Sequence, residues 1–115
     1  MRPLLLFLLI SFTASVSLPQ FPGGDVALAR FIQNNTRYPD SAKVNDVEGR
    51  VLVKFIINGD GSVADAQVVR HINKYLEDEA LRVIRMLPAF KPSLQDGKPV
   101  AYTMVLPIEF KLGNK

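Results

Sequence analysis

The stretch from Gly49 to Arg70, GRVLVKFIINGDGSVADAQVVR, decides the fold. From Gly49 to Ile57 apolar side chains recur at every second position, so one side of an extended backbone is apolar, which predicts a strand. The turn sequence Asn58–Ser62 follows at once, and its Asn-Gly and Asp-Gly pairs supply the positive φ values of a tight hairpin. Val63–Arg70 is therefore expected to return as the antiparallel partner.

A third strand is needed, because a lone hairpin is marginally stable in water. Val100–Lys111 alternates in the same way and is predicted to be that strand. Pro107 falls inside it, and a proline cannot donate to a ladder, so this strand belongs at an edge of the sheet. The preceding segment, Ala89–Pro99, contains three prolines or glycines and is expected to be an irregular surface connection.

Two amphipathic helices are predicted to cover the sheet. The first runs over Val26–Asn34 with Asp25 as its N-cap, and the second over Lys74–Leu87 with Asn73 as its N-cap. A short helical turn is expected after Pro39. The second helix returns the chain to the opposite end of the sheet, so the second and third strands both flank the first, in the order 2-1-3. We therefore predict an α+β fold, a two-layer sandwich with a three-stranded antiparallel sheet and two helices on one face.

The N-terminal residues have the order of a secretory signal: a basic start, an apolar run over Leu4–Ile10, and small residues up to Ser17. Cleavage is expected after Ser17. The alternative is a short membrane anchor, although a spanning helix needs roughly 20 apolar residues. Residues 1–17 are thus interpreted as a signal peptide or short anchor, residues 18–24 as an extended lead-in, and residues 25–112 as one domain.

Composition excludes several classes of protein. The 115 residues carry 14 Lys and Arg and 11 Asp and Glu, spread without a basic run, so we expect no nucleic-acid partner. The chain contains no cysteine, which excludes a disulfide scaffold. Asn58, Asp60 and Ser62 imitate a calcium loop, but its sixth position is Val63 rather than glycine, so no metal site is expected. No cofactor is expected either.

Catalysis is not expected. His71 is the only histidine; it follows a strand, has no carboxylate at a telling spacing, and is interpreted as a surface or loop residue. No nucleophile with an adjacent base and no glycine-rich elbow is present in the sequence. A small hydrolase is the weakest hypothesis, and any turnover would have to be lost in His71→Ala.

A series of short motifs carries a family resemblance, in the order Ala27-Leu28, Asn34, Tyr38-Pro39, Ala42, Glu48-Gly49, Val51-x-Val53-Lys54-Phe55, Asp60-Gly61-x-Val63, Val68-Val69, Glu79-Ala80-x-Arg82 and Phe90-Lys91-Pro92. Over residues 21–112 the chain resembles the C-terminal domain of TonB, from energy transducers that couple the inner membrane to outer-membrane transporters. The Phe21–Gly24 lead-in and the Leu106-Pro107-Ile108-x-Phe110 ending resemble those of stand-alone, Bacteroidetes-type members.

The resemblance implies a mechanism in which the edge strand binds the TonB box, a short segment at the periplasmic N-terminus of a TonB-dependent outer-membrane transporter. An exposed edge presents unpaired N–H and C=O groups to which an extended peptide can add. The residues implied for the edge are Val100, Ala101, Tyr102, Thr103, Met104, Val105 and Leu106. Those implied for a polar loop near the transporter are Asn35, Thr36, Arg37 and Tyr38.

Two departures from the family pattern affect these expectations. Phe90 stands where the family usually has tryptophan, and Asn35 stands where the best-known member has glutamine. Only residues 18–24 separate the apolar segment from the domain, too few to cross a periplasm. The resemblance therefore leaves three roles open: a free periplasmic binding module, a modulator that competes for or chaperones transporter boxes, or a subunit that reaches an ExbB/ExbD-type complex through another anchored protein. The expected location is the periplasm after cleavage, or the inner membrane facing the periplasm if the segment is retained as an anchor.

Alternative interpretations remain open for the edge and for the loop. The edge strand could instead be covered by the lead-in of its own chain. It could also pair with a second copy of the chain, and the protein would then be a self-associating module, a homodimer. Tyr38 could equally place its ring in the core at the end of a helix. For Arg37 a solvated surface position is favoured over a contact.

Overall fold

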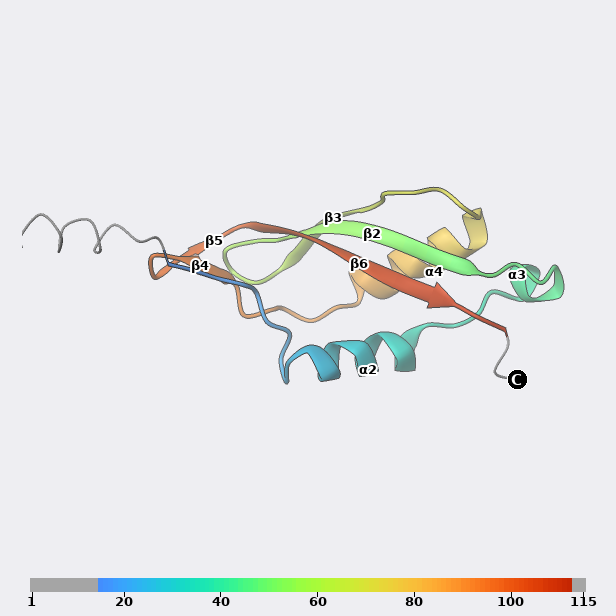
Figure 1. Ribbon diagram of the computed structural model, residues 1–115, viewed down its shortest axis with the longest axis horizontal. Coiled ribbons are helices and arrows are strands. Elements are labelled where there is room, and N and C mark those ends of the chain that lie inside the picture. The colour runs from blue at the N-terminus through green and yellow to red at the C-terminus, as the bar shows by residue number, and fades with distance from the viewer. Residues whose placement is uncertain (1–14, 113–115) are drawn as a thin grey trace, which may run out of the picture.

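The computed structural model describes residues 15–112, so the signal or anchor segment expected before Ser15 lies outside the described residues. The elements follow in the order β1 (Val16–Ser17), α2 (Asp25–Asn35), α3 (Asp40–Val44), β2 (Gly49–Ile57), β3 (Val63–Val68), α4 (Lys74–Arg85), β4 (Ser93–Gln95), β5 (Lys98–Val100) and β6 (Tyr102–Phe110) (Figure 1). The fold is α+β, as predicted. None of the helices within residues 15–112 has the length and apolar character needed to cross a membrane.

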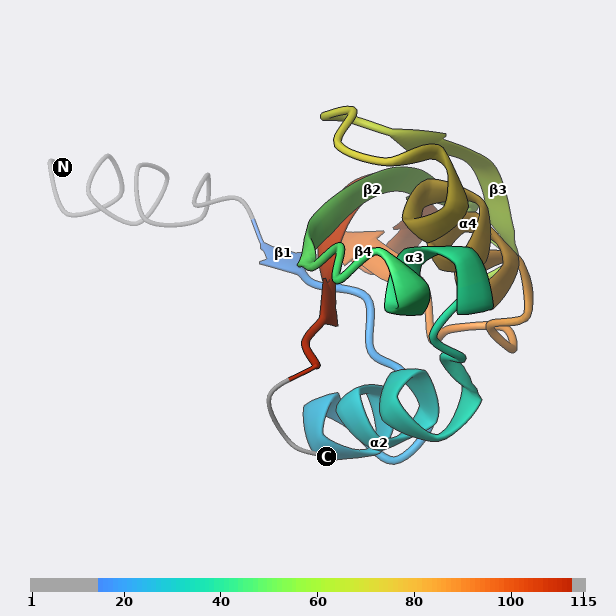
Figure 2. The same ribbon diagram turned by 90° about the vertical axis from the view of Figure 1, so that its right-hand side faces the viewer.

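The main sheet has three antiparallel strands in the order β3-β2-β6, which confirms the predicted order. β6 pairs with β2 along its whole length, from Gly49 opposite Phe110 to Ile57 opposite Tyr102. One face of this sheet forms the core, and α4 packs on it below β2 and β3 (Figure 2). The fully buried apolar side chains of these elements are Val51, Val53, Phe55, Ile57, Leu76, Ala80, Val83, Ile84, Ile108 and Phe110.

The predicted hairpin is present, with its return strand ending at Val68 rather than Arg70. Gly61 has a φ of 89°, and its carbonyl oxygen accepts a hydrogen bond of 2.8 Å from the N–H of Phe90. The Asp60 carboxylate accepts hydrogen bonds from the N–H and the hydroxyl of Ser62, at 2.9 and 2.6 Å. The hairpin turn is therefore fixed both by its own side chains and by the segment after α4.

The helices begin and end close to the predicted residues. Asn73 caps α4, since its side chain accepts hydrogen bonds from the N–H groups of the second and third helical residues. The prediction that Asp25 caps the first helix was wrong: α2 begins at Asp25, and the residue before it is Gly24, with a φ of 89°. A glycine adopts this conformation without steric cost, so the chain can turn sharply into the helix there.

The prediction of an irregular segment over residues 89–99 was also wrong. β4 and β5 form a second hairpin, and β1 pairs with β4 to complete a small three-stranded sheet. Its turn is Asp96-Gly97, with φ values of 52° and 82°, the left-handed pair typical of tight hairpins. The third strand of the main sheet consequently begins at Tyr102, two residues later than predicted.

The expected lead-in is part of the packed structure. Pro19 and Phe21 are buried, and Gln20 exchanges two backbone hydrogen bonds with Lys91, of 3.0 and 2.8 Å. The ring of Phe21 lies 5.5 Å from that of Phe90, centroid to centroid, in an edge-to-face arrangement. Phe90 thus acts as a buried anchor between the N-terminal segment and the sheet.

Candidate partner-binding edge

The outer edge of β6 is the part of the predicted site that the structure leaves open. Within residues 15–112, β2 is the strand that pairs with β6, and no second strand is recorded on its other side. Residues Tyr102–Leu106 lie on this edge, as expected. Val100 does not, because it belongs to β5 and pairs with Ser93. Ala101 lies between the two strands.

The pairing pattern determines which backbone groups of β6 face outward. Leu52 accepts a hydrogen bond from Val69, on the β3 side, so its N–H and C=O point away from β6. Leu52 lies opposite Pro107. In an antiparallel ladder, bonded and non-bonded pairs alternate, so the groups of Pro107 and of every second residue from it face away from β2. The outward residues of β6 are Thr103, Val105, Pro107 and Glu109.

The side chains of β6 alternate between the two faces of the sheet. Met104 and Leu106 are half-buried against the core, and Ile108 and Phe110 are fully buried. Val105 points to the opposite face and has 47% of its surface exposed. The edge therefore presents a row of main-chain groups between an apolar inner side and an open outer side.

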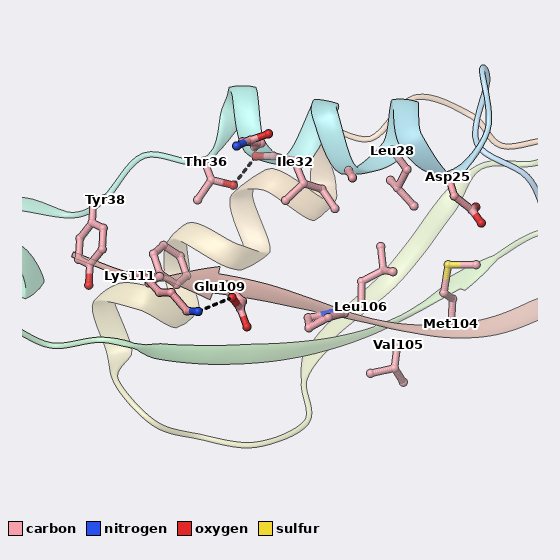
Figure 3. Close-up of a pocket in the computed structure, with 14 residues that line it drawn as sticks. Asp25, Leu28, Ile32, Thr36, Tyr38, Met104, Val105, Leu106, Glu109 and Lys111 are labelled. Carbon is pink, nitrogen blue, oxygen red and sulfur yellow. Dashed lines mark hydrogen bonds and ion pairs between the residues drawn. The ribbon is translucent and has the colours of Figure 1, made fainter. Parts of the chain in front are cut away.

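A groove of about 910 Å³ runs along the inner side of this edge, between α2 and β6 (Figure 3). Leu28 and Ile32 line it from α2, and Met104 and Leu106 line it from β6. α2 runs in the same direction as β6, so Asp25 lies near Met104 at one end and Thr36 lies toward Glu109 at the other (Figure 3). The groove floor is mainly apolar, with Asp25 at one end and Glu109 and Lys111 at the other.

The polar residues at the end of α2 are engaged by their own helix. The side-chain amide of Asn35 donates to the carbonyl oxygen of Phe31 at 2.7 Å, and the Thr36 hydroxyl donates to that of Ile32 at 2.6 Å. Thr36 also lines the groove. The Ile32 carbonyl oxygen also accepts a hydrogen bond of 3.0 Å from the Thr36 N–H, so the Thr36 side chain adds a second bond to the last turn of α2.

The loop after α2 is held by two residues that were not predicted as site residues, Glu79 and Arg82 of α4. The Glu79 carboxylate accepts a hydrogen bond from the Arg37 N–H at 2.6 Å. The Arg82 guanidinium donates to Glu79 at 2.7 Å and to the carbonyl oxygen of Asn35 at 2.7 Å. Their spacing of three residues on one helix was the signal in the sequence that the two side chains could pair. Their contact with the loop could be identified only from the tertiary structure.

The electrostatics of Glu79 reflect this arrangement. Burial alone would raise its pKa, but the hydrogen bonds from Arg82 and from the Arg37 N–H outweigh burial, so its pKa lies below the ordinary value. Glu79 is therefore ionised at neutral pH and fixes the loop through charge-assisted bonds. The side chain of Arg37 itself lies in solvent, as favoured from the sequence.

Tyr38 places its ring against the core, one of the two alternatives considered for it. Its ring packs edge-to-face on Phe110 at 5.6 Å, and its hydroxyl donates to the carbonyl oxygen of Val47. The same side chain lines the end of the groove. Burial, followed by the charges of Glu48 and Asp46, raises the pKa of the hydroxyl, so it remains a donor.

The opposite edge of the sheet, β3, is blunted. A register shift interrupts its pairing with β2, and Asp65 at this point has a φ of 54°. A bulge and a short strand are features by which proteins protect an edge from added strands. Over the part of the chain that the structure describes, β6 is the longer and more regular of the two main-sheet edges.

The remaining charged residues do not form a reactive cluster among residues 15–112, where no group of metal-ligating side chains occurs. Glu109 accepts hydrogen bonds from Arg50 and lies near Lys111; Arg50 first and Lys111 second lower its pKa. His71 is exposed, as expected, but it has a carboxylate partner that was not: its Nδ1 lies 2.9 Å from Glu77.

Comparisons with known proteins agree with this architecture. Residues 34–112 match the family model described as Gram-negative bacterial TonB protein C-terminal. The chain is 36% identical over 78 residues to Protein TonB of Helicobacter pylori, covering 64% of this chain and 27% of that protein. It is 33% identical over 78 residues to Protein TonB of Pseudomonas aeruginosa, covering 68% and 23%. The chain thus spans about a quarter of the length of these curated relatives.

Solved structures give the same result. The NMR solution structure of the Helicobacter pylori TonB-CTD matches with a TM-score of 0.58 at 32% identity, covering 76% of this chain and 78% of that one. The Pseudomonas aeruginosa TonB CTD matches with a TM-score of 0.54 at 31% identity, covering 70% and 81%. The family match covers more than half of the chain, and the sheet and helices have the expected arrangement. The chain therefore belongs to the family of TonB C-terminal domains.

Proposed function

We propose that this domain binds the TonB box of an outer-membrane TonB-dependent transporter in the periplasm, by adding it as a strand to β6, and thereby takes part in energy-coupled transport. Family membership supports the transport role. The observation that carries the mechanism is the row of outward-facing main-chain groups at Thr103 and Val105 beside an apolar groove.

The occupant that fits this row is an extended peptide. Donors and acceptors alternate along an edge strand at a spacing that another strand reproduces, whereas a helix uses its own backbone groups internally. Side chains of an added strand on the inner face would meet Leu28 and Ile32 of α2. The blunted β3 edge offers no comparable run.

The expected affinity is modest. Four main-chain hydrogen bonds at about 1 kcal/mol each are offset by ordering of the peptide. Because main-chain groups carry most of this energy, the contact should tolerate many changes of side chain. Residues Asn35, Thr36, Arg37 and Tyr38 support it indirectly, by fixing the end of α2 and of the groove.

The test is an NMR titration of the full 115-residue chain with a peptide copying the N-terminal segment of a TonB-dependent transporter from the same organism. The largest shifts are expected at the amides of Thr103 and Val105. Two peptides N-methylated at neighbouring positions serve as matched controls, because only one of two successive amides of an added strand faces β6. One methylated peptide should lose binding and its neighbour should keep it.

Equal binding of both methylated peptides would contradict strand addition and favour a contact through side chains. Unchanged spectra at millimolar unmodified peptide would reject peptide binding by this domain altogether.

A further inference from the structure

Pro107 interrupts the open edge at its centre. Its position opposite Leu52 places it among the outward residues, between Val105 and Glu109. A proline has no backbone N–H, so one donor is missing from an otherwise regular row. The outward groups, in chain order, are therefore the N–H and C=O of Thr103, the N–H and C=O of Val105, the C=O of Pro107, and both groups of Glu109.

The missing donor has a different effect on the two halves of the edge. An added strand opposite Tyr102–Leu106 finds four consecutive partners, at Thr103 and Val105. In a strand that continues past Leu106, a carbonyl group faces the proline ring and finds no N–H donor there. The β2 ladder does not lose a bond, because Pro107 is at a non-bonded pair.

We propose that Pro107 sets the frame of the partner strand: a segment of about five residues pairs with Tyr102–Leu106 and leaves the edge at Pro107. This inference rests on the proposed function and adds the length and register of the segment that binds. Glu109 and Lys111 then lie beyond the pairing frame, where Glu109 remains bound to Arg50.

The same frame determines which side chains of the added strand, the guest, face the groove and which face the open side of the sheet. Guest residues opposite Met104 and Leu106 project to the inner face, toward the groove floor formed with Leu28 and Ile32. The guest residue between them, opposite Val105, projects to the open face, where Val105 is 47% exposed. The recognised segment is therefore extended, with apolar residues at two positions separated by one.

The test uses proline scanning of outward positions, which removes single donors without breaking the β2 ladder. Binding of a five-residue and a nine-residue transporter-derived peptide to the full chain is measured by NMR titration. Val105→Pro should weaken both peptides about tenfold. Glu109→Pro, the matched control, should change binding of the five-residue peptide by less than about twofold.

Pro107→Ala provides the gain-of-function counterpart, because it restores the missing N–H. It should tighten the nine-residue peptide about fivefold and leave the five-residue peptide unchanged, the effect of one added hydrogen bond. Thermal unfolding of each variant checks that it remains folded. Thr103→Pro replaces Val105→Pro should that variant not fold.

The outcomes separate this inference from the proposed function. If neither peptide binds the unmodified chain, strand addition itself fails. If both peptides bind and Glu109→Pro weakens the five-residue peptide as much as Val105→Pro does, or Pro107→Ala leaves the nine-residue peptide unchanged, strand addition stands and the frame set by Pro107 is wrong.

Discussion

Among the glycines of residues 15–112, Gly61 is the one at which the fold tolerates a side chain least. Its φ is 89°, and a Cβ added there would lie 2.0 Å from the carbonyl oxygen of Phe90, which is backbone and cannot move aside cheaply. We expect Gly61→Ala to lower the free energy of unfolding by more than about 2 kcal/mol in chemical denaturation.

Gly97 provides the matched control for this prediction. Its φ of 82° is similar, but no atom lies within 4 Å of an added Cβ. Gly97→Ala should therefore cost only the left-handed backbone strain, about 1 kcal/mol. Equal losses in the two variants would mean that the close approach to Phe90 does not contribute.

The Glu79 carboxylate should make stability depend on pH. Its folded-state pKa is lowered, so the stabilisation is fully present above the ordinary value of 4.5 and is lost as the pH falls through the lowered folded value. Glu79→Gln should cost about 1–2 kcal/mol at pH 7. The difference between the two proteins should shrink in acid, as measured by denaturant unfolding from pH 7 to pH 3. A difference that stays constant over this range would contradict the assigned role.

At the scale of elements, β1 is a part of the domain that the expected cleavage after Ser17 would remove. The buried Ser93 hydroxyl donates to the carbonyl oxygen of Ser17 at 2.7 Å, and Asp96 pairs with Ser15 through its N–H and its carboxylate. A chain beginning at Leu18 should be less stable than one beginning at Ser15, by about 1–3 kcal/mol. Thermal unfolding of both tests this, and identical midpoints would show that β1 is dispensable.

The long elements were predictable because each contains enough residues for its periodic pattern to be recognised in the sequence. β2, β3, β6 and α4 each show several repeats of their pattern, and the Asn73 cap and the Pro107 edge signal were correct. β4 and β5 have three residues each, too few for alternation to be detected. Their Asp96-Gly97 turn was visible in the sequence, but the neighbouring prolines favoured an irregular segment.

The candidate site was predictable to a smaller extent. An edge strand at Tyr102–Leu106 followed from strand order and from Pro107, which are local signals. The groove required the distance between α2 and β6, and the loop support required contacts between Glu79, Arg82 and residues more than forty positions away. Such contacts arise from tertiary packing, which periodicity does not encode.

At the scale of the molecule, the two edges of the main sheet have different properties. β3 is short and bulged, whereas β6 is regular and faces a groove. The small sheet of β1, β4 and β5 lies at one end, near the start of β6 (Figure 1). Within residues 15–112, this arrangement leaves the long β6 edge without a second strand, whereas the bulge and short length of β3 disfavour pairing at the other edge.

Amide hydrogen exchange along β6 of the full chain tests the open edge most directly. The N–H groups of Met104 and Leu106, bonded to β2, should be protected, and those of Thr103 and Val105 should exchange rapidly until the transporter peptide is added, when both become protected. Slow exchange at Thr103 and Val105 without peptide, at concentrations where the chain is monomeric, would show that the edge is already covered and would contradict the mechanism.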